Sequence, residues 1–159
     1  MTGDAVAPLE QAVDIAAPID AVWALVSDVR RMNEWSPQVT STRLSAGFDD
    51  VSAGTRFTNR NAHGELVWTT HAEVVAFTAP GQTGEVAFRV DENWVVWSFH
   101  LAATDAGTRL TQRREAPHGI SPLSLGFTDD YLGGYDAFTA SQLAGMRETL
   151  EAIKAAAER

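Results

Sequence analysis

The chain has 159 residues, a size typical of one domain, and it contains no cysteine, which excludes disulfides and cysteine-ligated metal sites. Its formal charge of −9 argues against a nucleic-acid partner, which would need clustered Lys and Arg to neutralise phosphates. The sequence shows no signal peptide and no run near the roughly 20 apolar residues that cross a bilayer, so we expect a cytoplasmic protein without membrane insertion.

The N-terminal part of the chain predicts a tail, one strand and two short helices. Residues 1–8 look like a flexible tail, and residues 9–15 alternate as a first strand. From Ile19 to Val26, apolar side chains recur at the i, i+3, i+4 and i+7 spacing of an amphipathic helix. Asp28 can cap a second short helix, which Pro37 ends.

From residue 39 to residue 115 the hydrophobic period changes to two, which predicts β-strands. The expected strands cover residues 39–44, 54–61, 65–77, 84–90, 94–103 and 107–115. Their links are short and rich in turn residues, so we expect an antiparallel meander. After Pro122 the sequence turns helical, and Met146, Leu150 and Ile153 form the apolar stripe of a long terminal helix.

This order of elements predicts an α+β fold in which a curved, seven-stranded antiparallel sheet wraps around the C-terminal helix. A curved sheet and a straight helix do not fit closely along their whole length, so we expect space between them. Residues 9–159 are expected to form a single domain.

Four segments resemble the helix-grip (Bet v 1-like, or SRPBCC) superfamily, which includes a birch-pollen allergen, START lipid-transfer domains and polyketide cyclases. They are AAPIDAVWALVSDVRRMNEWSP (16–37), GTRFTNRN (54–61), GTRLTQRRE (107–115) and GMRETLEAIKAAAE (145–158). The nearest resemblance is to the bacterial polyketide cyclase/dehydrase and lipid transport family, from about Leu9 onward. It implies a fold more than an activity, because the superfamily spans binders, transporters and cyclases.

Strand alternation indicates which side chains face the expected space, because one face of each strand must be apolar. The inward set on the strands is Phe57, Asn59, Asn61, Trp68, Thr70, Phe88, Trp97, Phe99, Gln112 and Arg114. Apolar walls with sparse polar groups are typical of small-molecule pockets. In the alternative interpretation the polar members are structural, with Arg114 reaching the rim. A register error of one residue would instead turn inward a different polar set, namely Arg60, His71, Ser98, His100 and Arg113.

The segment before the last helix adds aromatic candidates for the cavity. Phe127, Tyr131, Tyr135 and Phe138 recur at about one helical turn. The Gly133-Gly134 pair among them either ends a short lid helix or lets the helix approach the sheet closely. Trp35, at the end of the second short helix, is expected to pack where the short helices meet the long one, and it could also help to close the cavity.

The sequence contains no motif that demands a metal, a nucleotide or a catalytic triad. The four histidines show neither HxxxH nor HExxH spacing, and GxGxxG, P-loop and GxSxG patterns are missing. We therefore expect no cofactor and no metal.

The leading interpretation is a monomer or homodimer that binds a hydrophobic small molecule in a cavity between the sheet and the C-terminal helix. The ligand would be a lipid, a polyketide-like molecule or another aromatic compound. Two alternatives stay open. One is a cofactor-independent polyketide aromatase/cyclase that uses the same cavity, with Arg114 stabilising enolate charge. The other is a protein-interaction or regulatory module.

Overall fold

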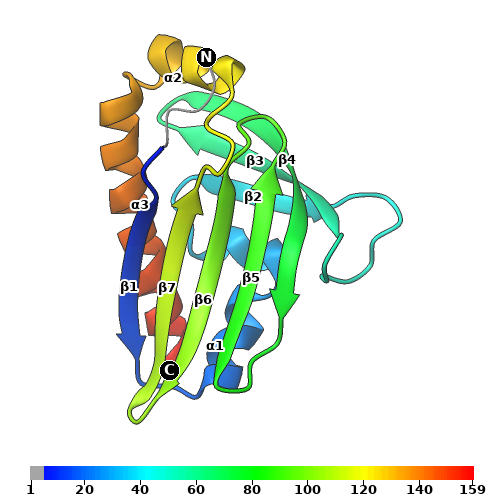
Figure 1. The fold of residues 1–159 in the computed structure, drawn as a ribbon, viewed down its shortest axis with the longest axis vertical. Coiled ribbons are helices and arrows are strands. Elements are labelled where there is room, and N and C mark those ends of the chain that lie inside the picture. The colour runs from blue at the N-terminus through cyan, green and yellow to red at the C-terminus, as the bar shows by residue number, and fades with distance from the viewer. Residues whose placement is uncertain (1–5) are drawn as a thin grey trace.

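The computed structural model describes residues 6–159, in which one sheet covers three α-helices and a short 3-10 helix (Figure 1). The strands are β1 (Leu9–Ile15), β2 (Val39–Leu44), β3 (Arg56–His63), β4 (Leu66–Thr78), β5 (Thr83–Val90), β6 (Val96–Thr104) and β7 (Gly107–Glu115). The helices are α1 (Ile19–Val26), η1 (Val29–Glu34), α2 (Pro122–Tyr131) and α3 (Tyr135–Ala157). The predicted tail, residues 1–8, lies partly outside the described residues; of its described part, Val6 packs against the apolar core.

The seven strands form one antiparallel sheet in the order β1-β7-β6-β5-β4-β3-β2. The strands from β2 to β7 follow one another as a meander, and β1 pairs with β7. The sheet curves in front of α3 and α1, and β2 and β3 run across the direction of β6 and β7 (Figure 1). This arrangement confirms the predicted helix-grip fold, and the strand ends differ from the expected ones by two residues at most.

The curvature of the sheet has local causes in the strands. The register shifts between Val39 and Ser41 on β2, and again between Val74 and Ala76 on the long strand β4. Such bulges insert an extra residue into one strand, which bends it and increases its twist. The bulges therefore let the sheet turn around α3, while β4 stays paired with β3 and β5.

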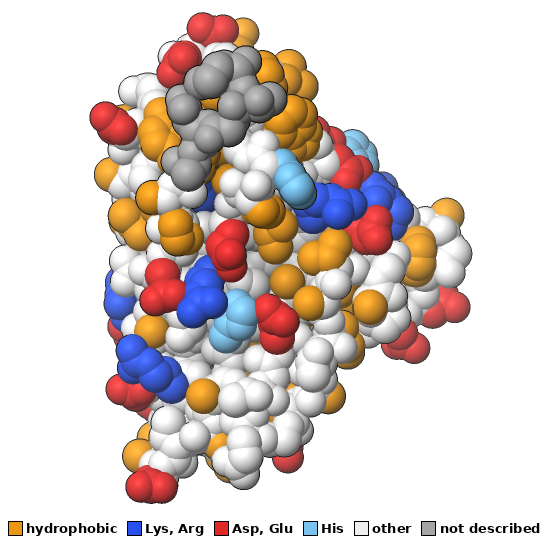
Figure 2. Space-filling model, viewed as in Figure 1, with side chains coloured by type: hydrophobic (Ala, Val, Ile, Leu, Met, Phe, Trp, Pro, Cys, Tyr) orange, Lys and Arg blue, Asp and Glu red, His pale blue; other side chains and the backbone are white. Residues whose placement is uncertain are grey.

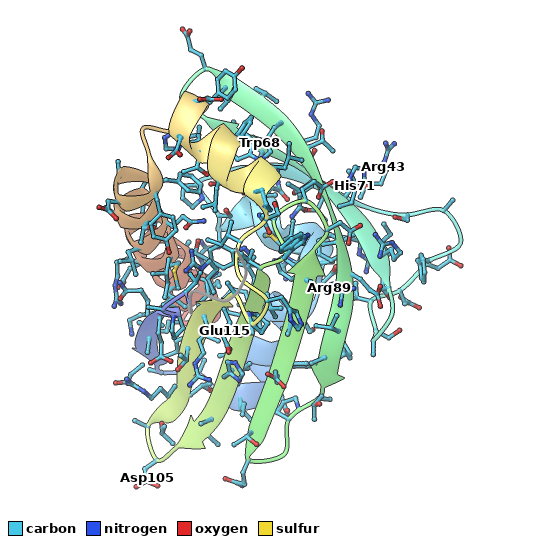
Figure 3. The ribbon with its side chains drawn as sticks, turned by 45° about the horizontal axis from the view of Figure 1, so that its top comes forward. Arg43, Trp68, His71, Arg89, Asp105 and Glu115 are labelled. Carbon is cyan, nitrogen blue, oxygen red and sulfur yellow. The ribbon has the colours of Figure 1, made fainter. Side chains whose placement is uncertain are left out.

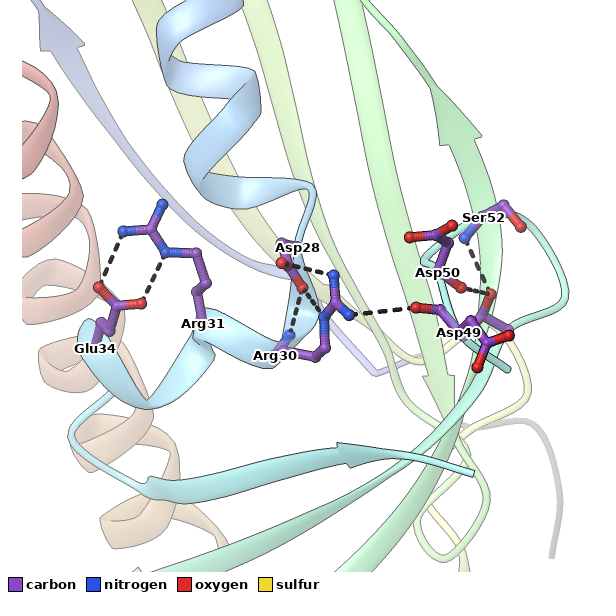
Figure 4. Close-up of polar contacts among 8 residues, drawn as sticks. Asp28, Arg30, Arg31, Glu34, Asp49, Asp50 and Ser52 are labelled. Carbon is purple, nitrogen blue, oxygen red and sulfur yellow. Dashed lines mark hydrogen bonds and ion pairs between the residues drawn. The ribbon is translucent and has the colours of Figure 1, made fainter. Parts of the chain in front are cut away.

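The two short helices follow the sequence signals closely. Asp28 Oδ1 accepts a hydrogen bond from the Arg30 backbone N–H at 3.0 Å and also pairs with its guanidinium (Figure 4). Arg30 in turn reaches the Asp49 backbone carbonyl at 3.3 Å, which ties η1 to the β2–β3 loop. Partial burial by itself raises the pKa of Asp28, but the hydrogen bonds from Arg30 outweigh it and hold this pKa below its usual value.

The core is divided into two apolar clusters, one around α1 and α3 and one around β3, β4 and β5. Val22, Leu110 and Leu150 are fully buried in the first cluster. In the second, Phe57 and Phe88 meet edge to face with ring centroids 5.2 Å apart. The cavity described below is bordered by members of both clusters, among them Trp35 of the first and Phe88 of the second.

Gly107, the first residue of β7, packs directly against the backbone that connects β1 to α1. Its φ is +147°, and a Cβ at this position would lie 2.1 Å from Ile15 O and 2.8 Å from Ala17 N. The neighbouring Thr108 hydroxyl donates a hydrogen bond to Ala17 O at 2.8 Å. Only glycine allows the hairpin backbone to come this close to the β1–α1 connection.

Candidate functional site

A cavity of about 420 Å³ lies between the concave face of the sheet and the helices α2 and α3. Side chains of β3 to β7 line one side of it. Met32 and Trp35 from the end of η1, Phe127 from α2 and Met146 from α3 line the other. The volume falls within the range of about 300–1,000 Å³ found for small-molecule sites.

Most of the side chains proposed from the sequence line this cavity. They are Asn59, Asn61, Trp68, Thr70, Phe88, Trp97, Phe99, Gln112 and Phe138. Of the residues that a one-residue shift would have turned inward, Ser98 borders the cavity, whereas the two histidines face the other way. His71 pairs with Glu92 on the outer face, and His100 lies 3.4 Å from Glu85 there. Figure 2 shows this outer face, where acidic and basic side chains are interspersed over the strands.

Four of the proposed residues lie outside the cavity lining: Phe57, Arg114, Tyr131 and Tyr135. Phe57 is 1% exposed and packs behind Phe88 in the core. Arg114 is 2% exposed, lies farther along β7 than Gln112, and donates a hydrogen bond through Nη2 to the carbonyl of Ala7 at 3.0 Å.

The two tyrosines are displaced by the break between α2 and α3. Helix α2 ends at Tyr131 and α3 begins at Tyr135, with Gly133 and Gly134 both at positive φ between them. Tyr131 points to solvent, with 65% of its surface exposed, although its ring contacts Phe127. The glycine pair therefore ends a short helix, which was one of the two alternatives considered from the sequence. Because α2 and α3 are separate helices, the four aromatic residues do not form one helical stripe.

The polar side chains at the β3–β4 end of the cavity are held by their own hydrogen bonds. Thr42 Oγ1 donates to Asn59 Oδ1 at 2.6 Å. Asn61 Nδ2 donates to Thr70 Oγ1 at 3.1 Å and to the carbonyl of Trp68 at 3.4 Å. These bonds fix the orientation of both amides.

Gln112, on β7, differs from these residues. Its Oε1 is buried and has no hydrogen-bond partner within residues 6–159. The residue lies opposite Phe99 in the ladder and lines the cavity beside it. A buried amide oxygen without a donor is unusual in native proteins, where such groups are nearly always paired.

Helix α2 and the start of α3 close the cavity through aromatic contacts with the sheet. The rings of Phe127 and Trp68 are 5.7 Å apart, and Phe138 meets His63 edge to face at 5.9 Å. Figure 3 shows Trp68 beneath α2 at this end of the sheet. Helix α2 is anchored at its N-terminus by Ser121, whose hydroxyl donates to the carbonyl of Glu92 at 2.6 Å.

From the sequence, Trp35 was expected to be mainly structural, and Phe138 was the one cavity-lining residue of α3 that was proposed. Trp35 is 7% exposed, packs in the core cluster of α1 and α3, stacks under the Arg31 guanidinium at 5.1 Å, and also lines the cavity. On α3 the lining residues are Phe138, Ser141, Gln142, Ala144, Gly145, Met146, Glu148 and Thr149. Their three- and four-residue spacing is a helical signal that could have been read from the sequence.

The interior of the cavity carries little charge. Of the described lining residues, His63 and Glu148 are the ionisable ones, and both are exposed. Across residues 6–159, no three His, Cys, Asp or Glu side chains are grouped so that they could hold a metal ion. Within that same range, no helix is long and apolar enough to span a membrane.

Comparison with solved structures reveals similar folds. A polyketide-cyclase-like protein from Corynebacterium glutamicum is 30% identical, with a TM-score of 0.59, over 92% of this chain and 88% of that chain. The Zhui aromatase/cyclase from Streptomyces sp. R1128 is 15% identical, with a TM-score of 0.70, over 96% of this chain and 94% of that one. The di-domain aromatase/cyclase StfQ of the steffimycin pathway is 17% identical, with a TM-score of 0.71; 98% of this chain matches 51% of that chain.

Among curated proteins, none matches the chain. A family profile does match it, over residues 7–158, and therefore covers the sheet, the short helices and the long helix together. The chain belongs to the polyketide cyclase/dehydrase and lipid transport family.

Proposed function

We propose that this protein binds a hydrophobic small molecule in the cavity between the sheet and α3. The observation that carries the proposal is the cavity itself, which measures about 420 Å³ and has aromatic walls from Trp68, Phe88, Trp97 and Phe99. Burial of apolar ligand surface against such walls supplies affinity, at about 25 cal/mol per Å² of area removed from water. The few polar groups would orient the ligand.

Membership of the family supports this proposal, because its description combines polyketide cyclases with lipid transport. Two of the similar folds belong to proteins described as aromatase/cyclases, whose sequence identity to this chain is 15% and 17%. Identities this low support the fold alone. A ligand of polyketide-like or other aromatic character is therefore proposed from the cavity walls and the family together.

Binding is favoured over turnover by the kind of groups that line the cavity. A cyclase must move protons, which requires side chains that titrate near the reacting atoms. The ionisable lining residues, His63 and Glu148, are both exposed at the cavity mouth, and Arg114 lies outside the lining. The cyclase and the protein-interaction module stay alternatives.

A fluorescent probe tests the proposal directly. N-phenyl-1-naphthylamine is uncharged and brightens in apolar surroundings, so its titration with the purified protein reports occupancy of the cavity. Thr70→Trp should abolish binding, because Thr70 lines the cavity and a larger ring there fills it. Thr69→Trp is the matched control, since Thr69 is the next residue of β4 and is exposed on the opposite face.

The proposal expects saturable binding by the unaltered protein and by Thr69→Trp, and loss of binding in Thr70→Trp. Circular dichroism of both variants checks that the sheet is intact. If the unaltered protein does not bind the probe, or if both variants bind it equally, the cavity is not a ligand site.

A further inference from the structure

We propose that the contact between His71 and Glu92, called the latch below, holds helix α2 over the cavity in a pH-dependent way, so that acidification slows ligand exchange. This inference rests on the binding function proposed above. It is carried by a chain of hydrogen bonds that runs from the outer face of the sheet, through the turn between β5 and β6, to the helix that covers the cavity.

The latch joins β4 to the turn between β5 and β6, which covers residues 91–95. The backbone N–H of His71 donates to Glu92 Oε1 at 2.8 Å, and the His71 ring Nδ1 lies 2.6 Å from Glu92 Oε2. The backbone N–H of Asp91 donates to the carbonyl of His71 at 2.8 Å. These contacts hold the turn against a single residue of β4, next to the ladder pair Ala72–Val90.

The same turn holds the N-terminus of α2. The hydroxyl of Ser121 donates to the carbonyl of Glu92 at 2.6 Å, and the Ser121 backbone N–H donates to the carbonyl of Asn93 at 3.2 Å. The Ser121 hydroxyl also accepts a hydrogen bond from the Ser124 backbone N–H at 3.1 Å and so caps the helix. The start of α2 can therefore leave the sheet only if it breaks these bonds or if the turn moves with it.

Helix α2 is the cover that the latch holds in place. Phe127 and Thr128 line the cavity, and the rings of Phe127 and Trp68 are 5.7 Å apart. At its other end α2 is joined to α3 through Gly133 and Gly134, both at positive φ. Glycine permits backbone rotations that other residues resist, so this pair is a joint about which α2 can pivot when its N-terminus is released.

The turn that connects the latch to α2 is strained. Trp94 has φ of +70°, a left-handed conformation that is unfavourable for a bulky side chain. Hydrogen bonds within the turn hold this conformation: the Trp94 backbone N–H donates to the carbonyl of Val90, and Asn93 Oδ1 accepts from the backbone N–H of Val95, both at 3.0 Å. Strain of this kind favours rearrangement of the turn when the contacts of Glu92 weaken.

The charge of His71 sets the strength of the latch. Histidine is the side chain that ordinarily changes its charge between about pH 5 and pH 8. The His71 side chain is 53% exposed, so it exchanges protons freely with solvent. A protonated ring forms an ion pair with the Glu92 carboxylate, whereas a neutral ring leaves a weaker, singly charged hydrogen bond. The latch is therefore strongest in acid and weakens as the pH rises through this range.

Several other charged groups lie near His71 on the outer face of the sheet and its turn. They are Arg43 of β2, Arg56 and Arg60 of β3, Glu73 of β4, Arg89 of β5 and Asp91 of the turn. Arg56 is paired with both Glu73 and Asp91, so these two carboxylates are already neutralised. The uncharged Thr58 separates Arg43 from His71 in the same row of the sheet. Glu92 therefore remains the carboxylate in direct contact with the ring.

Stopped-flow kinetics of N-phenyl-1-naphthylamine at about pH 5.5 and about pH 8.5 test the latch. The dye is uncharged at both pH values, so its own charge contributes nothing. We expect dissociation from the unaltered protein to be about twofold to fivefold slower at the lower pH, the range for one exposed ion pair. Association should slow by a similar factor, because a cover controls passage in both directions, and the dissociation constant should change little.

Variants assign the effect to the latch. In His71→Gln and in Glu92→Gln the ion pair cannot form, so the rates at the two pH values should become equal. His100→Gln is the matched control, because His100 is also a histidine of the outer face beside a carboxylate, but it contacts Glu85 on β5 and Ser98 on β6 rather than the turn that holds α2. This control should keep the pH dependence of the unaltered protein.

The outcomes keep this inference separate from the binding proposal. If the unaltered protein exchanges the dye at the same rates at both pH values, or if His71→Gln keeps the pH dependence, the latch is wrong while the cavity remains a binding site. A pH effect that changes the dissociation constant but not the association rate also overturns it, because the titrating group would then act on the bound dye. If the dye does not bind at either pH, the binding proposal fails and the latch fails with it.

Discussion

Replacing Gly107 by alanine tests the contact that joins the β6–β7 hairpin to the end of β1. The new Cβ would lie 2.1 Å from Ile15 O and 2.8 Å from Ala17 N. Both are backbone atoms, so the clash can be relieved only by moving the β1–α1 connection away from the hairpin. That movement would also lengthen the hydrogen bond from Thr108 to Ala17 O, which is 2.8 Å in the native structure.

Three costs add up in this variant. A residue with a Cβ pays about 1–3 kcal/mol for a backbone conformation that glycine alone adopts readily. Forcing a packed region apart costs about 1–3 kcal/mol more. The weakened Thr108 hydrogen bond adds about 1 kcal/mol. We therefore expect Gly107→Ala to lower the free energy of unfolding by about 3–7 kcal/mol, a large part of the roughly 5–15 kcal/mol of a typical domain.

Urea unfolding followed by tryptophan fluorescence measures this loss. Gly54→Ala is the matched control: Gly54 has φ of +91°, but a Cβ there would have no described atom within 4 Å. The control should lose only about 1–2 kcal/mol, the cost of a left-handed conformation. Equal losses in the two variants would refute the reasoning, because the close approach to Ile15 and Ala17 would then carry no cost.

Three further predictions concern the core, the η1 cap and the cavity cover. Phe57→Ala should lower the free energy of unfolding by about 3–5 kcal/mol, measured in urea, because the ring is 1% exposed. The pKa of Asp28 is lower in the folded state than in the unfolded state. Its ionised carboxylate therefore contributes its full stabilisation above the unfolded-state pKa of about 3.9, and this stabilisation is lost as the pH falls through the folded-state pKa. Asp28→Asn should therefore reduce stability at neutral pH, and the stability of this variant should decrease less on acidification than that of the unaltered protein. Urea unfolding midpoints at several pH values measure both effects. Phe127→Ala should raise the dissociation rate of the naphthylamine dye about threefold to tenfold in stopped flow, because it removes the ring contact with Trp68.

Each of these has its own contradicting result. An unchanged urea midpoint for Phe57→Ala would mean that the ring is not part of the packed core. An acid profile for Asp28→Asn that parallels the unaltered protein would remove the cap as a source of pH dependence. For the cover, Leu123→Ala is the control, since Leu123 is on the same helix and 75% exposed; equal dissociation rates in both variants would show that α2 does not close the cavity.

The sequence by itself determined the fold and the faces of the strands. Pro18, Asp28 and Pro37 mark the short helices through local backbone chemistry, which needs no tertiary context. Side chains on a strand alternate with a period of two, so an apolar residue such as Phe57 or Trp97 identifies the inner face for its whole strand. This is why Asn59 and Gln112 were assigned to the inner face from sequence, and both lie there.

Only the tertiary structure decided which inner residues meet the cavity. The cavity borders Gln112 but not Arg114, two residues farther along β7, where the arginine is 2% exposed and donates to the carbonyl of Ala7. Alternation cannot show this difference, because both residues lie on the same face. Gly133 and Gly134, both at positive φ, likewise separate α2 from α3, and on α2 Tyr131 is exposed while Phe127 lines the cavity. Curvature and helix placement depend on contacts between distant segments, and no local sequence pattern encodes them.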